Sequence, residues 1–375
     1  MSKRVMAERV GTWLRQRAGY GSAVLLGSVC WTALRFEYTP QFAPSSYERI
    51  YDFTAAVPFG KRVLIPLLAH VATRCGISQL HAFEMMEIAA AILLLLGLER
   101  IFRLCCDLPA ARLLSMGMLG VLPWLFFVPR TWMLLFPWDV PAMAVMAWAI
   151  QTALKGRFPA MCGLMVLASL NRESAILLPG VWLAVWMGRK PWLRLLGRVA
   201  FLCALHVVVQ AAIHPSLADN VAYYNLHGEM SLKCGEIWRL LNNWYWLTGS
   251  GQRVFVWLGT MAGLPVAFGL GGVEFPSALR RLGLVAWGYF WMLMVVGNIY
   301  EARIYGEITV LLYVPVALWI WRRVTGKVVY FQPGGIAEKD AAMPRGVFWL
   351  EALAAVGVVL AVVALGWGLA HGWLP

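Results

Sequence analysis

About eleven apolar stretches follow one another along this 375-residue chain, and each of them must be buried in protein or in lipid. Hydrophobic residues make up 61% of the sequence and charged residues 14%, whereas about a quarter of a soluble protein is charged. The composition therefore predicts an all-α, polytopic transmembrane helical bundle of about 10–12 spans, counting short half-helices. We expect a single integral membrane domain over residues 1–375, since no repeat or separate soluble domain is visible.

Charge is distributed unevenly between the two sides of the predicted bundle. If the N-terminus is cytoplasmic, 21 of the 32 Lys and Arg residues lie on the inner side, with only 7 of the 19 acids. Positive charge accumulates on the cytoplasmic side of membrane proteins, so this asymmetry predicts a multi-pass protein with a cytoplasmic N-terminus. The basic character then reflects contact with anionic membrane lipids. No basic-aromatic module indicates nucleic-acid binding.

Three polar segments connect the predicted spans. Residues 37–79 form a long first outer loop, whose second half is predicted to be an interfacial helix because apolar residues recur there at helical spacing. Residues 214–253 form an outer loop rich in Tyr, Trp and Asn. Residues 322–346, which contain Pro333-Gly334-Gly335, are predicted to be a flexible cytoplasmic linker before the last span.

The stretch from residue 158 to residue 187 is apolar except for Asn171-Arg172-Glu173-Ser174, and basic residues flank both of its ends. About 30 residues cannot cross a membrane twice, because each crossing needs about 20 residues. The pattern predicts two short half-helices that meet at the four polar residues. Non-helical backbone at that depth must be buried in protein or line a wet cavity, so we expect this turn to face one.

Four outer segments carry both acidic and basic residues. The predicted pairings are Asp52 with Lys61 and Arg62, Arg130 with Asp139, Arg172 with Glu173, and Glu301 with Arg303. One interpretation is that each pair neutralises itself and holds helices together. The other is an outward-facing cleft, in which a carboxylate acts as a base and arginine forks hold a phosphate. No Cys or His spacing indicates a metal site, so no cofactor is assigned, although a divalent metal remains possible.

A resemblance to a known family rests on a long first outer loop that bears Asp52 and on four sequence segments: FGKRVLIPLLA, PWDVP, NRESAILLP and YEARIYGE. Over most of residues 30–320 the chain resembles the C-type (GT-C) glycosyltransferases, and in particular uncharacterised bacterial members of that superfamily. The resemblance implies an enzyme of the bacterial inner membrane with a periplasmic active face. It would transfer a sugar from a polyprenyl-phosphate donor to a glycan, lipid or protein acceptor.

The same resemblance implies roles for individual residues. Asp52 would deprotonate the acceptor hydroxyl, with Glu48 as the nearest alternative acid. The arginines would hold the lipid phosphate, and the other acids would orient these arginines or bind sugar hydroxyls. The predicted substrate- and phosphate-binding residues are Lys61, Arg62, Arg130, Asp139, Arg172, Glu173, Glu301, Arg303 and Tyr305. The first loop lacks the paired acids of the family's metal-dependent members, which puts metal dependence in doubt.

Two other functions fit the same residues. Broken half-helices that carry charge are how secondary transporters build their binding sites, so a transporter or flippase for a lipid-linked sugar or small anion is the main alternative. A scaffold or accessory subunit of an envelope assembly complex, with purely structural charges, is the third.

Overall fold

The computed structural model describes residues 3–55, 59–127, 134–213, 243–251, 253, 259, 261–297, 299 and 301–326, with the side chains of residues 3–17 and 296 excepted. Throughout these ranges the chain is helical and forms no strand, apart from an isolated bridge between Gln41 and Leu135. The all-α prediction is confirmed for this part of the chain. The longer helices are α1 (Lys3–Tyr38), α3 (Leu64–Arg74), α4 (Gln79–Phe102), α5 (Leu108–Met116), α6 (Met118–Phe126), α7 (Asp139–Leu154), α8 (Phe158–Asn171), α9 (Leu177–Trp186), α10 (Trp192–Ile213), α14 (Leu264–Gly271), α15 (Ser277–Val296) and α16 (Gly306–Thr325).

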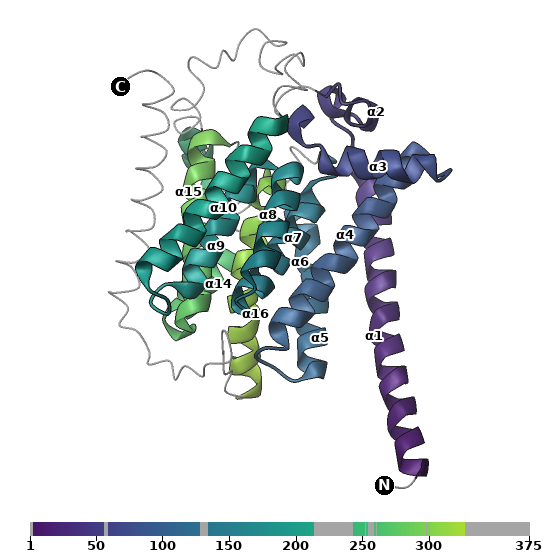
Figure 1. Ribbon diagram of the computed structural model, residues 1–375, viewed down its shortest axis with the longest axis vertical. Helices are drawn as coiled ribbons and strands as arrows, with labels where there is room; N and C mark the ends of the chain where they lie inside the picture. The colour runs from purple at the N-terminus through teal and green to yellow at the C-terminus, as the bar shows by residue number, and fades with distance from the viewer. Residues whose placement is uncertain are drawn as a thin grey trace.

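Most of these helices run back and forth between the two ends of one bundle (Figure 1). The short helix α2 (Tyr47–Tyr51) lies at one end, and α3 lies across that end beside the start of α4. We call this end the α3 end, and the other the opposite end. The predicted interfacial helix is thus present, and it begins three residues after Lys61.

The predicted half-helices are present as α8 and α9. Asn171 is the last residue of α8, and a 3-10 turn at Glu173–Ile176 leads into α9. Between them Arg172 has an extended backbone (φ −165°, ψ 152°), so the helix is interrupted at the position that the polar residues predicted. The start of α8 and the end of α9 both lie at the opposite end, so the interruption between them lies toward the α3 end (Figure 1).

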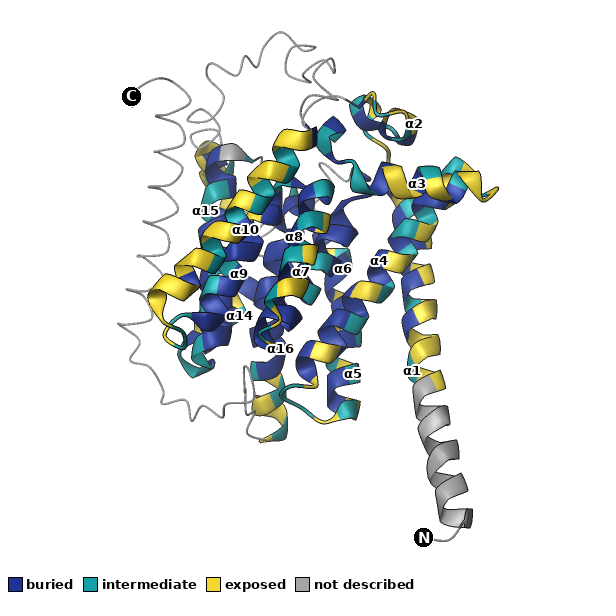
Figure 2. Cartoon of the chain, viewed as in Figure 1, coloured by how far each residue is buried: buried dark blue, intermediate teal, exposed yellow. Residues whose placement is uncertain are grey.

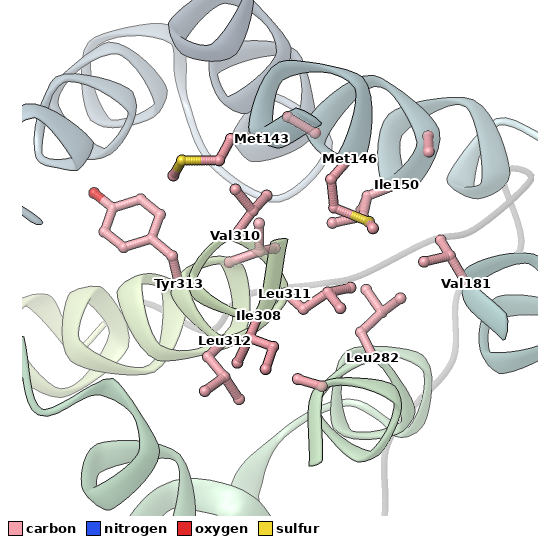
Figure 3. Close-up of a cluster of buried hydrophobic side chains, with 14 of the residues drawn as sticks. Met143, Met146, Ile150, Val181, Leu282, Ile308, Val310, Leu311, Leu312 and Tyr313 are labelled. Carbon is pink, nitrogen blue, oxygen red and sulfur yellow. The ribbon is translucent and has the colours of Figure 1, made fainter. Parts of the chain in front are cut away.

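The core is built around α16, which packs against α7, α14 and α15. Figure 3 shows Met143, Met146 and Ile150 of α7 facing Val310 and Leu311 of α16. Met143 and Met146 are fully buried, so they belong to the core and do not face outward. Figure 2 shows the same division, with buried residues inside the bundle and exposed residues along the outer sides of α1 and α10.

Three helical segments among the described residues are long and apolar enough to cross a membrane: Leu108–Phe126, Trp192–Ile213 and Ala302–Thr325. Five shorter apolar helices accompany them, including the two half-helices. The larger predicted number of spans and the orientation stay predictions.

Some predicted features lie outside the described residues. These are Arg130, the last apolar stretch, and most of the 214–253 loop and of the 322–346 linker. The loop is described from Asn243 to residue 251. The side-chain amide of Asn243 anchors it to the bundle, because Nδ2 donates to the carbonyl oxygens of Met294 and Gly297, both at 2.8 Å. The end of the loop therefore lies beside the end of α15.

Candidate functional site

Charged side chains from six separate segments meet near the α3 end. They come from the last turn of α1, from the segment before α3, from α4, from the start of α7, from the α8–α9 interruption, and from the region where α16 begins. We call them the arginine cluster: Arg35, Arg62, Arg172, Arg303, Glu87, Asp139, Glu173, Glu301 and Glu307. These residues are up to 272 positions apart in the sequence numbering, and only folding brings them together.

Asp139 is the shared acid of the cluster. One of its oxygens lies 3.4 Å from Arg172 Nη1 and 3.7 Å from Arg303 Nη1, and the other lies 3.4 Å from Arg35 Nη2. Asp139 occupies the first turn of α7, where the helix dipole also favours a carboxylate. Because its side chain is fully buried, these arginines and the helix end replace the water it would otherwise bind.

Arg35 Nη1 also pairs with Glu87, which projects from α4. Arg35 Nη2 donates to the Phe136 carbonyl oxygen at 3.0 Å. Neither Arg35 nor Glu87 belongs to the predicted site. Arg35 lies at the outer end of the first apolar stretch and Glu87 lies within the second, so the rule that ionisable residues in apolar segments are functional candidates would have identified both.

Beside the α8–α9 interruption, Arg172 lies 3.7 Å from Glu307 Oε2, and the Ser174 hydroxyl donates a hydrogen bond to the other oxygen of Glu307. A cavity of about 10 Å³, roughly the space for one water molecule, is lined by these three residues and by Asn171. Asn171 Nδ2 donates to the Trp138 carbonyl oxygen, and Asn171 Oδ1 is buried without a hydrogen-bond partner. A cavity is therefore present at this turn, but it is small.

Arg62 and Glu173 form the most accessible pair of the cluster. Arg62 Nη2 and Nε lie 3.1 and 3.2 Å from Glu173 Oε2, while Arg62 Nη1 and Glu173 Oε1 have no hydrogen-bond partner. The side chain of Glu173 is 40% exposed, against 15% for Glu301 and 3% or less for Glu307, Asp139 and Glu87. Loss of water on burial lowers the pKa of the Arg62 guanidinium, and the Glu173 carboxylate opposes that shift.

Aromatic rings enclose the guanidinium groups. The Cζ atom of Arg303 lies 3.7 Å from the centre of the Phe136 ring, that of Arg62 lies 4.7 Å from the Trp138 ring, and that of Arg35 lies 4.3 Å from the Phe126 ring. Cations are attracted to the faces of such rings, and the rings also exclude water. The short segment before α7, which carries Phe136 and Trp138, therefore holds two of the predicted phosphate-binding arginines in place.

Three of the four predicted pairings have both partners among the described residues, and one of the three is correct. Glu301 does pair with Arg303, at 2.5 Å. Arg172 and Glu173, in contrast, turn to different partners, because the extended backbone at Arg172 sends neighbouring side chains in opposite directions. Tyr305 is fully buried, and its hydroxyl donates to the Ile299 carbonyl oxygen at 2.7 Å, which supports the turn before α16.

The two predicted catalytic acids lie outside the cluster. Glu48 and Asp52 are exposed on and just after α2, and within the described ranges neither forms an ion pair with the half-buried Lys61 or with Arg62. The turn at Asp52 is held by its neighbours: Phe53 adopts a left-handed backbone (φ 56°), and its ring stacks on His70. The Tyr51 carbonyl oxygen in turn bonds to His70 Nε2 at 2.9 Å.

Charge balance limits what the cluster can bind. Four guanidinium groups meet five carboxylates, so the arginines are already compensated among the residues that the structure describes. Glu173 has the most exposed of these carboxylates, so the Arg62–Glu173 pair is the one that can open with least loss of buried contact. Across the described ranges no group of three or more His, Cys, Asp or Glu residues is arranged to hold a metal ion.

Comparison with known proteins adds no relative to this picture. No protein-family model matches the chain, and no match was found among the curated proteins or among the solved structures.

Proposed function

We propose that this chain is a multi-pass glycosyltransferase of the bacterial inner membrane. It transfers a sugar from a polyprenyl-phosphate donor to a glycan, lipid or protein acceptor. The α3 end faces the periplasm and the N-terminus is cytoplasmic. Three apolar helical segments long enough to span a membrane, and the apolar exposed sides of α1 and α10, support the membrane placement.

The Arg62–Glu173 pair is the observation that carries the proposal. A phosphate needs donors that are buried, oriented and not fully used, and Arg62 offers Nη1 in addition to the two nitrogens that face Glu173. Trp138 and Phe59 hold the guanidinium from its faces, so its fork is oriented before any substrate binds. Glu173 can swing toward solvent when a phosphate replaces it.

The chemistry then divides between Asp52 and Arg62. The acceptor hydroxyl loses its proton to Asp52 as its oxygen attacks the anomeric carbon of the sugar. The bond from that carbon to the phosphate oxygen breaks, and the lipid phosphate leaves with the bonding electrons. Arg62, with Lys61 beside it in the sequence, stabilises the negative charge that this phosphate gains. Arg172 and Arg303 lie deeper, paired with Asp139, and hold the charged groups behind Arg62 in place.

The direct test uses purified protein in lipid nanodiscs. Sugar transfer or donor hydrolysis from a panel of polyprenyl-phosphate sugars is followed by mass spectrometry, with the Asp52→Asn and Glu48→Gln variants in parallel. We expect turnover with at least one donor, loss of at least about a hundredfold in Asp52→Asn, as for removal of a general base, and little change in Glu48→Gln. Full turnover by Asp52→Asn would remove the proposed base. Loss in Glu48→Gln instead would move that role to Glu48.

A transporter or flippase for a lipid-linked sugar or small anion is the second candidate. It is favoured by the interruption between α8 and α9, where buried Arg172 and Glu307 line a cavity, as charged residues do in broken transporter helices. The two functions differ in the product. Saturable binding without turnover of any donor, together with movement of the intact donor between leaflets, would support transport.

A further inference from the structure

The opposite end of the bundle carries a second cluster of charge, which the proposed chemistry does not use. We infer that the α9–α10 turn and the start of α8 bind the headgroup of an anionic phospholipid, whose acyl chains lie along α10. The basic patch consists of Arg157, Lys190, Arg194 and Arg198. The inference rests on the proposed membrane placement and is independent of glycosyl transfer.

Acids do not compensate the basic patch within the part of the chain that the structure describes. Between residues 155 and 213 the only acid is Glu173, and it lies in the arginine cluster, where it pairs with Arg62. Among the described residues none of the four cations of the basic patch has an ion-pair partner. The contrast with the arginine cluster is chemical: there every guanidinium faces a carboxylate, whereas here no described carboxylate supplies the counter-charge.

Aromatic rings connect the cations into one surface. The ring centre of Trp182 lies 6.0 Å from that of Trp186 and 5.2 Å from that of Phe158. Lys190 Nζ lies 4.8 Å from the Trp186 ring, and Arg198 Cζ lies 5.0 Å from the Phe158 ring.

The two remaining cations lie next to this row of rings. Arg194 precedes Arg198 by one helical turn and so shares its side of α10. Arg157 directly precedes Phe158 and ends the turn between α7 and α8. Four positive residues from three consecutive helix ends therefore border one row of rings.

An apolar surface continues from the basic patch. The Phe201 ring centre lies 6.0 Å from that of Phe158, and Leu193, Leu196 and Phe201 are exposed by 88%, 50% and 54%. Only 11% of the apolar segment of α10 is buried, against 83% of that of α16, and Figure 2 shows exposed residues along its length. A cationic patch at the end of an exposed apolar helix matches a phospholipid, with its anionic headgroup and long acyl chains. A free phosphate would use only the first half of this surface.

Native mass spectrometry of the whole protein released from mixed micelles tests the inference. Phosphatidylglycerol is the anionic probe, and phosphatidylcholine of the same chain length is the zwitterionic comparison. The variant is Lys190→Gln with Arg194→Gln, both at the turn. The matched control is Arg322→Gln with Arg323→Gln, which removes the same charge from the same end of the bundle, at the end of α16.

We expect retained phosphatidylglycerol on the wild-type protein and on the control. The variant should bind it about thirtyfold more weakly, since each basic residue near a membrane surface contributes about 1 kcal/mol. Lys190→Arg with Arg194→Lys keeps both charges and should keep the lipid, so loss of lipid in that variant would indicate damage to the fold. Glycerol phosphate in excess should not displace the lipid, because it lacks the chains.

Three outcomes would overturn the inference: equal retention of the two lipids by the wild-type protein, equal losses in the variant and the control, or displacement by glycerol phosphate. A stable dimer that excludes lipid from α10 would assign this surface to a second copy of the chain. The readout is lipid retention, so a failure of the proposed transfer activity would leave the result unaffected.

Discussion

At the scale of single residues, Asp139 decides how the arginine cluster is held together. Three guanidinium groups share its carboxylate, and removal of one partner from a buried ion pair leaves a charge without compensation. The Arg62–Glu173 pair differs, because its acid is partly exposed and one nitrogen of its base is unused. We therefore expect Asp139 to have a structural role in the cluster and Arg62 to be the residue that exchanges partners.

This difference predicts opposite effects of two substitutions on the KM for the donor. Arg62→Gln should raise KM about tenfold or more, because it removes charged hydrogen bonds to the phosphate. Glu173→Gln should lower KM, because it removes the carboxylate that competes for Arg62. Arg74→Gln, at the exposed end of α3, is the matched control for loss of charge. Equal changes in Arg62→Gln and Arg74→Gln, measured by steady-state kinetics in nanodiscs, would contradict a direct contact with the phosphate.

At the scale of helices, close contact between α14 and α15 depends on one glycine. A Cβ atom at Gly283 would lie 2.0 Å from the ring of Phe268, which is fully buried in α14. Gly197 in α10 offers a comparison, because a Cβ there would meet no atom within 4 Å. The two glycines lie in helices, so both gain the same helix propensity from alanine and differ only in packing.

Gly283→Ala should therefore lower the free energy of unfolding by about 1–3 kcal/mol, as overpacking of a filled interior does. Gly197→Ala should leave it unchanged or raise it by up to about 1 kcal/mol. Thermal unfolding of the purified variants in one detergent, followed by tryptophan fluorescence, compares them. A loss of stability in both variants would point to a general intolerance of the helices to alanine and not to the Phe268 contact.

The interruption between α8 and α9 shows what could be predicted from the sequence at this scale. Four polar residues in a 30-residue apolar stretch with basic ends were enough to predict two half-helices. The partners of Arg172 were not predictable in the same way. They depend on the packing of α7 and α16, which brings Asp139 and Glu307 to it from distant positions, and on an extended backbone that no local pattern indicated.

At the scale of the whole molecule, charged residues gather at the two ends of the bundle, and the balance of acids and bases differs between the two groups. The arginine cluster at the α3 end balances acids against bases, whereas the basic patch at the opposite end does not. Successive apolar stretches run in alternating directions, and this alternation predicted which charged residues lie at each end. The separation was predictable because it depends only on the order of the helices. Arg35 and Glu87 were missed because their meeting depends on the packing of α1 against α4.

The proposed orientation can be measured with two variants that each contain one cysteine. The first keeps only Cys75, which is exposed just after α3. The second replaces all native cysteines and carries Arg322→Cys at the end of α16. In cells with a permeabilised outer membrane, a membrane-impermeant maleimide should label Cys75 and should label the second variant only after the inner membrane is broken. The reverse pattern would place the arginine cluster in the cytoplasm.

The position of Arg35 has a consequence for the way the protein is made. Its acceptor Asp139 lies 104 residues further along the chain, and Glu87 lies 52 residues further. At a synthesis rate of about 5–20 residues per second, roughly 5–20 s pass after Arg35 is synthesised before Asp139 exists. Neither carboxylate exists during the first half of that time, and only Glu87 exists during the second half. The long Arg35 side chain can reach the aqueous surface during this interval. The rate of translation therefore sets the time after which α1 can form its buried ion pairs.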